Sequence, residues 1–211
     1  MKIGLLVAMD KEYEQLSHLS DDNIVVMKTG IGKVNAALNA MRMIETCHPD
    51  VIISSGCAGG AVPILEILDV VVSKQIAYHD VYCGAEGGTR GQVQGMPLYF
   101  ETPDWIVDKA KELQYDGTVH SGLIASGDWF VDTPEKLQEI KAVHPDAIAI
   151  DMESAAIAQT CYINKVPFVS FRIISDVPTK ENNTTDYCKF WENVSERSFS
   201  VVSRFVESLQ A

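Results

Sequence analysis

The sequence predicts a single α/β domain with a twisted, mostly parallel mixed central sheet flanked by helices. Short apolar runs rich in β-branched residues recur along the chain, and segments with helical spacing of apolar residues follow most of them. Strands that alternate with helices favour a largely parallel sheet. No repeat, charge block or linker divides the 211 residues, so we expect one domain over 1–211.

The expected strands share short length and a high content of Val, Ile and other apolar residues. In chain order they are Ile3–Val7, Ile24–Met27, Val51–Ser54, Val70–Ala77, Val119–Ala125, Ala147–Ile150 and Phe168–Ile174.

The expected helices show apolar residues three and four positions apart. They are Lys11–Leu19, Val34–Cys47, Asp104–Leu113, Glu135–Lys141, Met152–Ile163 and a long last helix near Tyr187–Leu209. In the second helix, one face carries a stripe that we expect to pack on the core. This stripe consists of Val34, Ala37, Leu38, Met41 and Ile44.

Composition excludes several classes of protein. Acidic side chains number 29 against 17 basic ones, and the net charge of −12 argues against nonspecific binding to nucleic acid. No apolar run approaches the roughly 20 residues that span a bilayer, and no leader with a cleavage site is apparent. The five cysteines are scattered, without a C-x-x-C pair, which suits a reducing compartment. We therefore expect a cytoplasmic protein without membrane contact.

Two glycine-rich segments are candidate binding elements. Gly30-Ile31-Gly32-Lys33 joins a strand to a helix, but Met27 and Val34 occupy positions where a phosphate-binding P-loop needs Gly and Ser or Thr. A tight turn with a free helix N-terminus is the simpler interpretation. Cys83–Gly95 has five glycines in thirteen residues and is expected to be a long loop, either a binding loop or a surface linker.

A third small-residue segment, SSGCAGG from Ser54 to Gly60, follows a buried strand and would let a ligand approach the backbone closely. Cys57 within it has two interpretations. It is a thiol nucleophile if His79 lies beside it in space, and otherwise a small packed residue.

Acidic residues at the ends of expected strands are the more informative signal, because a buried carboxylate without a partner is costly. Glu12 follows the first strand, Asp151 and Glu153 follow the sixth, and Asp176 closes the seventh, four residues after Arg172. At the carboxyl ends of parallel strands these groups would meet in one crevice. Taken singly, each also fits a helix cap or a first-turn charge.

Seven motifs in order carry a family resemblance: MKIGLLVAMDKE, TGIGKVNAAL, SSGCAGG, YHDV, ASGDWFV, AIDMESAAIA and FRIISDV. Together they span nearly the whole chain, which resembles the 5′-methylthioadenosine/S-adenosylhomocysteine nucleosidases of the purine nucleoside phosphorylase superfamily. The resemblance implies a nucleoside phosphorylase-like fold, cofactor-free and metal-free hydrolysis of an adenine–ribose bond, a small-molecule nucleoside substrate and a homodimer. Nucleic acid is not an expected partner.

The resemblance also implies roles for the acids. Asp176, in the S-D motif, would protonate the leaving adenine, with Ser175 orienting it. Glu153, in the M-E motif, would bind the ribose hydroxyls while Met152 packs on the sugar. Glu12 would hold and deprotonate the attacking water, and Arg172 would help to fix that water.

The remaining implied residues bind substrate. Phe130 would stack on adenine and the backbone of Val131 would read the edge of the base. Cys57, Ala58 and Gly59 would lie beside the ribose, with Cys57 at a position where the family often has Ser.

Several alternatives stay open. A phosphorylase would need a cluster of arginines for its phosphate, whereas the chain has five arginines in all and places Glu12 at the first helix. A hydrolase for another 5′-modified nucleoside, a nucleoside-binding protein without catalysis, and a Cys–His amidase are further alternatives.

The 5′ specificity also stays open. The family's loop after Y-H-D reaches the partner's site with apolar groups, and here the corresponding Val81–Gly95 carries Glu86, Arg90 and Gln94. A longer, zwitterionic 5′ substituent such as homocysteine would suit this loop better than a methylthio group, which gains only from apolar burial.

Overall fold

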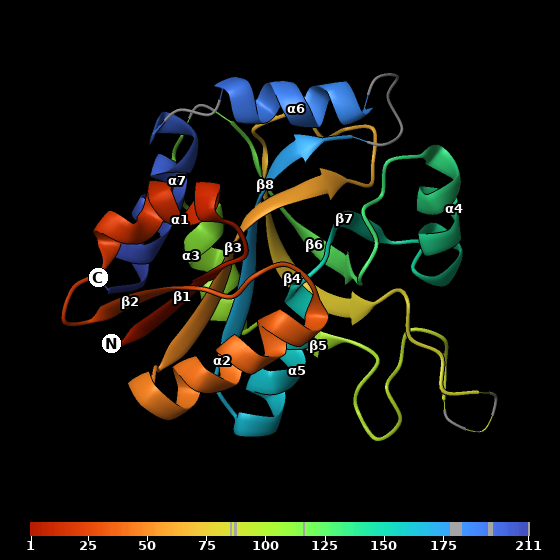
Figure 1. Cartoon of the computed structure of the whole chain (residues 1–211), viewed down its shortest axis with the longest axis horizontal. Helices are drawn as coiled ribbons and strands as arrows, with labels where there is room; N and C mark the ends of the chain where they lie inside the picture. The colour runs from red at the N-terminus through yellow and green to blue at the C-terminus, as the bar shows by residue number, and fades with distance from the viewer. Residues whose placement is uncertain (85, 87, 116, 178–182, 194–195, 211) are drawn as a thin grey trace.

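A computed structural model describes residues 1–84, 86, 88–115, 117–177, 183–193 and 196–210. One mixed sheet runs through the molecule, with helices on both of its sides (Figure 1). The strands are β1 (Ile3–Val7), β2 (Ile24–Lys28), β3 (Val51–Gly60), β4 (Val70–Tyr78), β5 (Phe100–Glu101), β6 (Val119–Ser126), β7 (Ala147–Asp151) and β8 (Phe168–Asp176). The helices are α1 (Asp10–Leu16), α2 (Lys33–Cys47), α3 (Asp104–Lys111), α4 (Pro134–Val143), α5 (Ser154–Asn164), α6 (Asn183–Asn193) and α7 (Glu196–Gln210), with a 3₁₀ turn at Ser17–Leu19.

The pairing of the strands brings distant segments together. Strand β1 lies between β2 and β3, and β3 pairs in parallel with β8. Strand β8 pairs antiparallel with β4, which continues through β6 to β7. Strand β7 then returns to the end of β3, where Gly59 faces Ile150. The pairing therefore closes on itself, and the ends of β3, β6, β7 and β8 meet around one space.

All seven strands expected from the sequence are present, so the α/β class and the mixed, mostly parallel sheet are confirmed. The main difference is the length of β3, because the segment SSGCAGG continues the strand to Gly60 instead of leaving it as a turn. The short edge strand β5 was not expected.

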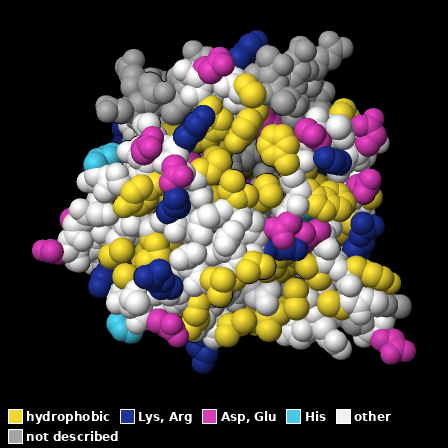
Figure 2. Space-filling model, in the orientation of Figure 1, with side chains coloured by type: hydrophobic (Ala, Val, Ile, Leu, Met, Phe, Trp, Pro, Cys, Tyr) yellow, Lys and Arg dark blue, Asp and Glu magenta, His cyan; other side chains and the backbone are white. Residues whose placement is uncertain are grey.

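The expected core-facing stripe of α2 is only partly right, because Ala37 and Ile44 pack against the core but the largest exposed members do not. Val34 and Leu38 are 70% and 64% exposed, and the buried residues are instead Ala36, Ala40 and Met43. Alanine at the buried positions lets α2 pack closely on α5 and the sheet, while the larger apolar side chains point outward. Figure 2 shows apolar side chains gathered over the region of α2 and α5.

Two other expectations about helices need correction. The long last helix near Tyr187–Leu209 is two helices, α6 and α7, which end and begin at Asn193 and Glu196. The expected helix Lys11–Leu19 ends earlier, at Leu16, and continues as the 3₁₀ turn. The described residues of Cys83–Gly95 have neither helix nor strand, as expected for a loop.

The core lies on both sides of the sheet. On one side α3 and α7 cover β1, β3 and β8, and Phe171 stacks on Phe205 with ring centroids 4.5 Å apart. On the other side α2 and α5 cover the sheet with small residues. Within the described parts of the chain, no helix combines the length and the apolar character that crossing a membrane requires.

Candidate active site

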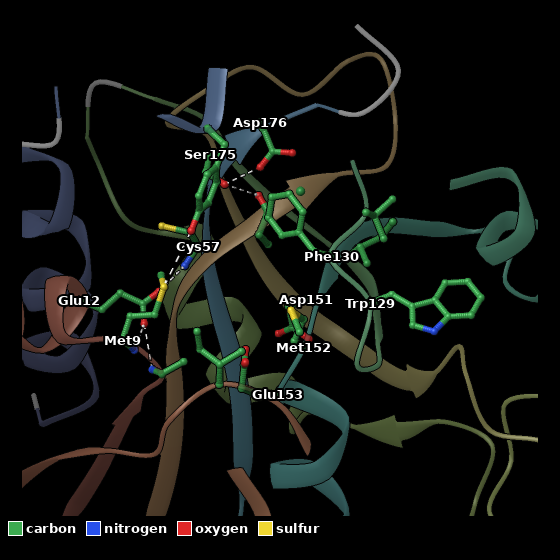
Figure 3. A pocket seen from close by; sticks show the side chains of 17 residues that line it. Met9, Glu12, Cys57, Trp129, Phe130, Asp151, Met152, Glu153, Ser175 and Asp176 are labelled. Carbon is green, nitrogen blue, oxygen red and sulfur yellow. Dashed lines mark hydrogen bonds between the residues drawn. The ribbon is translucent and has the colours of Figure 1, made fainter. Parts of the chain in front are cut away.

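A pocket opens where the ends of the central strands meet (Figure 3). Its walls come from the segments that follow β1, β6 and β7, from the last residues of β3 and β8, and from α6. The lining residues include all but one of the residues that the sequence predicted for the site: Glu12, Cys57, Ala58, Gly59, Phe130, Val131, Met152, Glu153, Ser175 and Asp176. The exception is Arg172, which lies behind the wall and is 1% exposed.

Glu12 is fixed by backbone donors from two elements. Its Oε2 accepts the N–H groups of Ala8 at 2.9 Å and Met9 at 3.0 Å, and its Oε1 accepts that of Cys57 at 3.0 Å. The carboxyl thus caps its own helix and also reaches the pocket-forming end of β3. Burial raises the pKa of Glu12, against the opposing effects of Arg172 and the backbone donors.

Arg172 forms the centre of a buried ionic cluster. Its Nε donates to Asp151 Oδ2 at 2.7 Å, and Nη2 lies 4.0 Å from Glu153 Oε2. Burial alone would lower the pKa of Arg172, but Asp151, Glu153 and Glu12 together raise it. The guanidinium therefore stays charged and holds three acids of the site around it.

Gly56 brings Glu12 and Arg172 together. A Cβ built on Gly56 would stand 2.4 Å from Glu12 Oε1 and 2.8 Å from Arg172 Nη1, both too close for real atoms. The φ of Gly56 is also +152°, which favours glycine. Both side chains therefore lie against the backbone at Gly56, which explains why this position needs glycine.

Glu153 connects the pocket to the turn before α2. Its Oε1 accepts the N–H of Gly32 at 2.9 Å, and the next N–H, that of Lys33, goes to Asp128 Oδ1 at 2.8 Å. The expectation of a free helix N-terminus is therefore wrong, because two carboxylates occupy it. Burial raises the pKa of Glu153 to about 7, with Asp151 and Glu12 adding to the rise and Arg172 opposing it.

Asp176 lies at the end of β8, on a different wall of the pocket from Glu12 (Figure 3). The hydroxyl of Ser175 donates to Asp176 Oδ1 at 2.7 Å, and the Asp176 side chain is nearly buried. A hydrogen bond from the neighbouring hydroxyl fixes the direction of the carboxyl, as the orienting role expected of Ser175 requires.

An aromatic and apolar wall completes the pocket. The ring of Phe130 meets that of Tyr187 edge to face, with centroids 5.3 Å apart. The Tyr187 hydroxyl lies 3.9 Å from the Sδ of Met9, and Ile31 also lines the cavity. The sequence predicted Phe130 but missed Met9, Ile31 and Tyr187, because no polar or spacing signal separates them from ordinary apolar residues.

The thiol nucleophile is not supported. Burial raises the pKa of Cys57 well above its usual value, and Glu12 and Asp176 add to the rise, so the reactive thiolate is disfavoured. Within the described residues, neither ring nitrogen of His79 has a hydrogen-bond partner. Its ring packs on Trp129, and burial lowers its pKa to about 4. Cys57 is therefore a small wall residue.

Comparisons with known proteins identify the family of this chain. The family model of the phosphorylase superfamily matches residues 15–207. A 5′-methylthioadenosine/S-adenosylhomocysteine nucleosidase from Anoxybacillus flavithermus is 38% identical over 90% of this chain and 83% of its own length.

Solved structures of the same nucleosidase superpose on nearly the whole chain. That from Streptococcus pneumoniae, with a transition-state inhibitor, has a TM-score of 0.90 and 31% identity, covering 99% of this chain and 100% of that one. That from Colwellia psychrerythraea, with adenine, has a TM-score of 0.89 and 31% identity, covering 99% and 96%. The chain therefore belongs to the 5′-methylthioadenosine/S-adenosylhomocysteine nucleosidases of the phosphorylase superfamily.

Proposed function

We propose that this protein hydrolyses the N-glycosidic bond of a 5′-thio-substituted adenosine, methylthioadenosine or S-adenosylhomocysteine, to adenine and the corresponding thioribose. The observation that carries the proposal is the placement of Asp176 and Glu12 on separate walls of one pocket. Two carboxyl groups that flank a glycosidic bond from different sides can act on the leaving group and on water.

Asp176 is the proposed general acid. Adenine is a poor leaving group as an anion, so its N7 must receive a proton while the bond breaks. Asp176 is nearly buried, lines the pocket and is oriented by the Ser175 hydroxyl. Phe130, on the same side of the pocket, offers a ring face or edge to the base, and the backbone of Val131 can read its edge.

Glu153 and Met152 are the proposed ribose contacts. The sugar gains positive charge as the bond to adenine breaks, so a carboxylate beside it lowers the barrier. Glu153 is held by Gly32 and aimed into the pocket, and its pKa of about 7 leaves much of it ionised at neutral pH. Met152 supplies an apolar surface beside it, and Cys57, Ala58 and Gly59 form the small-residue wall opposite.

Glu12 is the proposed base for water. Its carboxyl is fixed by three backbone donors, and the Arg172 guanidinium lies near it, beside Gly56. A water between Glu12 and the sugar would be oriented by the carboxylate, while Arg172 favours the ionised form that accepts a proton. Arg172 therefore acts behind the wall and not as a direct pocket residue.

Charge favours water over phosphate as the nucleophile. Among the described residues that line the pocket, none is Lys or Arg, while Glu12, Asp151, Glu153 and Asp176 all belong to the lining. Carboxylates repel phosphate, and Arg172 is already paired with Asp151. These observations favour a hydrolase over the related phosphorylases.

We also propose that the protein is a homodimer and acts in the cytoplasm. Large apolar side chains are exposed on the turn before α2, on α2 and on α5: Ile31, Val34, Leu38, Tyr162 and Ile163. A second copy would cover this face, and the loop Val81–Gly95 would lie near the partner's site.

The sedimentation coefficient tests the dimer. Leu38→Asp is expected to shift it to that of a monomer. Val143 lies outside this face, so Val143→Asp serves as the control and is expected to leave the dimer intact.

The 5′ preference remains a proposal of its own. The described pocket wall contributed by this chain is apolar, with Met9, Ile31 and Tyr187, whereas Glu86 and Arg90 of the loop are exposed. Polar loop groups near the partner's site would favour the homocysteine substituent. Equal kcat/KM for methylthioadenosine and S-adenosylhomocysteine would count against this preference.

The release of adenine in the presence and absence of phosphate tests the function. We expect adenine from methylthioadenosine and S-adenosylhomocysteine at rates that do not depend on phosphate, and little release from adenosine or hypoxanthine from inosine. Release that requires phosphate would identify a phosphorylase. Tight binding without release would identify a nucleoside-binding protein.

A further inference from the structure

A chain of buried hydroxyl groups leads from the ionic cluster into the core, and the proposed mechanism does not use it. Ser154, the first residue of α5, places its Oγ against the carboxylate of Asp151 and 3.0 Å from Arg172 Nη2. The same Oγ lies 2.6 Å from the hydroxyl of Ser170 on β8. All four side chains are buried.

We propose that Ser154 is a positioning residue for hydrolysis, which fixes the Asp151–Arg172 pair so that the other edge of the guanidinium faces Glu12. This inference rests on the proposed function. Ser154 does not itself line the pocket and, on the proposed mechanism, does not touch the substrate, so it acts only through Asp151 and Arg172.

The direction of the hydrogen bonds supports this role. A hydroxyl has one proton to donate and two lone pairs to accept with. Arg172 has only donors and the ionised Asp151 has only acceptors, so Ser154 accepts from Arg172 and donates to Asp151. The single Ser154 proton therefore has two acceptors within reach, Asp151 Oδ2 and the hydroxyl oxygen of Ser170. The Ser154 hydroxyl thus joins the Arg172 guanidinium to the Asp151 carboxylate.

The position of Ser154 makes the hold on Asp151 rigid. The backbone N–H of Ser154 also donates to Asp151, to Oδ1 at 3.2 Å, so the carboxylate is bound at both oxygens by one residue. Arg172 Nε donates to the same carboxylate, and Nη2 is shared between Ser154 and Ser54. These contacts leave Nη1 beside Gly56, where Glu12 Oε1 also lies, so that the charge of the guanidinium acts on the Glu12 carboxyl.

The chain of polar groups is anchored at its far end. The backbone N–H of Ser170 donates to Ser73 Oγ at 2.9 Å, and Ser73 shares a hydrogen bond of 2.8 Å with Thr102. Ser73 is as buried as Ser154 but contacts neither Arg172 nor Asp151 through any described hydrogen bond. It therefore provides the matched control for loss of a buried hydroxyl.

Loss of the Ser154 hydroxyl has a specific expected effect on Glu12. The charged and titratable groups around Glu12 and Arg172 come from four elements: Asp151 at the end of β7 and Glu153 just after it, Cys57 on β3, Asp176 on β8 and Tyr187 on α6. Only Arg172 among them favours the ionised form of Glu12. If the guanidinium is no longer fixed, it stabilises the ionised Glu12 less and the pKa of Glu12 rises. At a given acid pH, a smaller fraction of Glu12 is then ionised and able to accept a proton.

The test compares the pH profiles of Ser154→Ala, Ser73→Ala and the unchanged protein, measured as adenine release. For Ser154→Ala we expect kcat to fall about tenfold with little change in KM, and the acid limb of kcat to move to higher pH. Ser73→Ala is expected to lower the melting temperature while the acid limb stays in place. Ser170→Ala, which removes the hydroxyl that holds Ser154 Oγ from the side of β8, should loosen Ser154 and move the limb in the same direction by a smaller amount.

The outcomes separate the inference from the proposed function. No adenine release by the unchanged protein overturns the function itself. If the unchanged protein releases adenine normally and folded Ser154→Ala shows an unshifted acid limb of kcat, only the positioning role is overturned. Equal shifts in Ser154→Ala and Ser73→Ala would also overturn it, because the effect would then follow from general loosening of the core. If Ser154→Ala does not fold, an unshifted limb in Ser170→Ala overturns the inference.

Discussion

The carboxyl of Glu12 accepts the backbone N–H of Cys57 at 3.0 Å, which fastens α1 to the strand that forms one wall of the pocket. The other carboxyl oxygen holds the N-terminus of its own helix through Ala8 and Met9. The proposed base is therefore oriented before substrate arrives, and little reorganisation accompanies the reaction.

Glu12→Gln is expected to lower kcat by about a thousandfold, because an amide can hold water but cannot take its proton. The amide oxygen can still accept the N–H groups of Ala8 and Met9, but the amide NH2 then faces the N–H of Cys57, so we expect a modest loss of stability while ligand binding stays measurable. Adenine release gives kcat, and calorimetry with a methylthio-immucillin gives the affinity. Near-normal turnover by the variant would remove Glu12 as the base.

Asp176→Asn is expected to lower kcat by about a hundredfold to ten-thousandfold, because adenine then leaves without a proton at N7. Ser175→Ala keeps the acid but loses the bond that orients it, so we expect a smaller loss of about tenfold. A substrate analogue with a better leaving group should recover much of the activity of Asp176→Asn. No recovery would indicate that Asp176 does not protonate the base.

Gly56→Ala is expected to abolish activity and to lower the free energy of unfolding by about 2–4 kcal/mol, since the added methyl collides with Glu12 and Arg172. Gly84 is the matched control because it also has positive φ, +82°, but an added Cβ there meets nothing within 4 Å. Denaturant unfolding and adenine release should show about 1 kcal/mol of destabilisation and normal activity in Gly84→Ala. Equal effects of the two substitutions would contradict the packing around Gly56.

Glu153→Gln is expected to raise stability at alkaline pH while lowering kcat/KM about a hundredfold. The folded pKa of Glu153, about 7, lies above its ordinary value of 4.5, so the folded protein holds this proton more tightly than the unfolded chain. The unchanged protein therefore loses stability as pH rises from 4.5 to 7. The amide does not titrate, so the variant should gain about 1–3 kcal/mol above pH 7 and nothing below pH 4.5. A gain that does not depend on pH would contradict this explanation.

Leu68→Gly is expected to stabilise the protein by about 0.5–1 kcal/mol with unchanged activity, because Leu68 has φ +76°, where a branched side chain is strained. Its exposed side chain loses little packing on removal. Ile67 is a similarly exposed neighbour without positive φ, so Ile67→Gly should destabilise by about 1 kcal/mol. Thermal unfolding of both variants distinguishes relief of strain from a general effect of glycine.

The strands were predictable because buried β-branched runs give a strong local signal. Most of the pocket residues were predictable because they lie in the seven family motifs. The buried side of α2 was not predictable, because alanine contributes little to hydrophobic periodicity. The Ala36–Ala40 face therefore gives a weaker hydrophobic signal in the sequence than the exposed Val34–Leu38 face. The contribution of Tyr187 depends on where α6 packs, which local sequence does not determine. The contact between Ser154 and Ser170 could not be predicted, because local sequence does not show that the start of α5 lies against β8.

A crystal structure of the protein with a methylthio-immucillin tests the central claim most directly. We predict that N7 of the base lies within hydrogen-bond distance of Asp176, that the ribose hydroxyls contact Glu153, and that a water between Glu12 and the sugar faces the anomeric carbon. A ligand bound with its base away from Asp176, or with Glu12 on the same face of the sugar as the leaving base, would contradict the account.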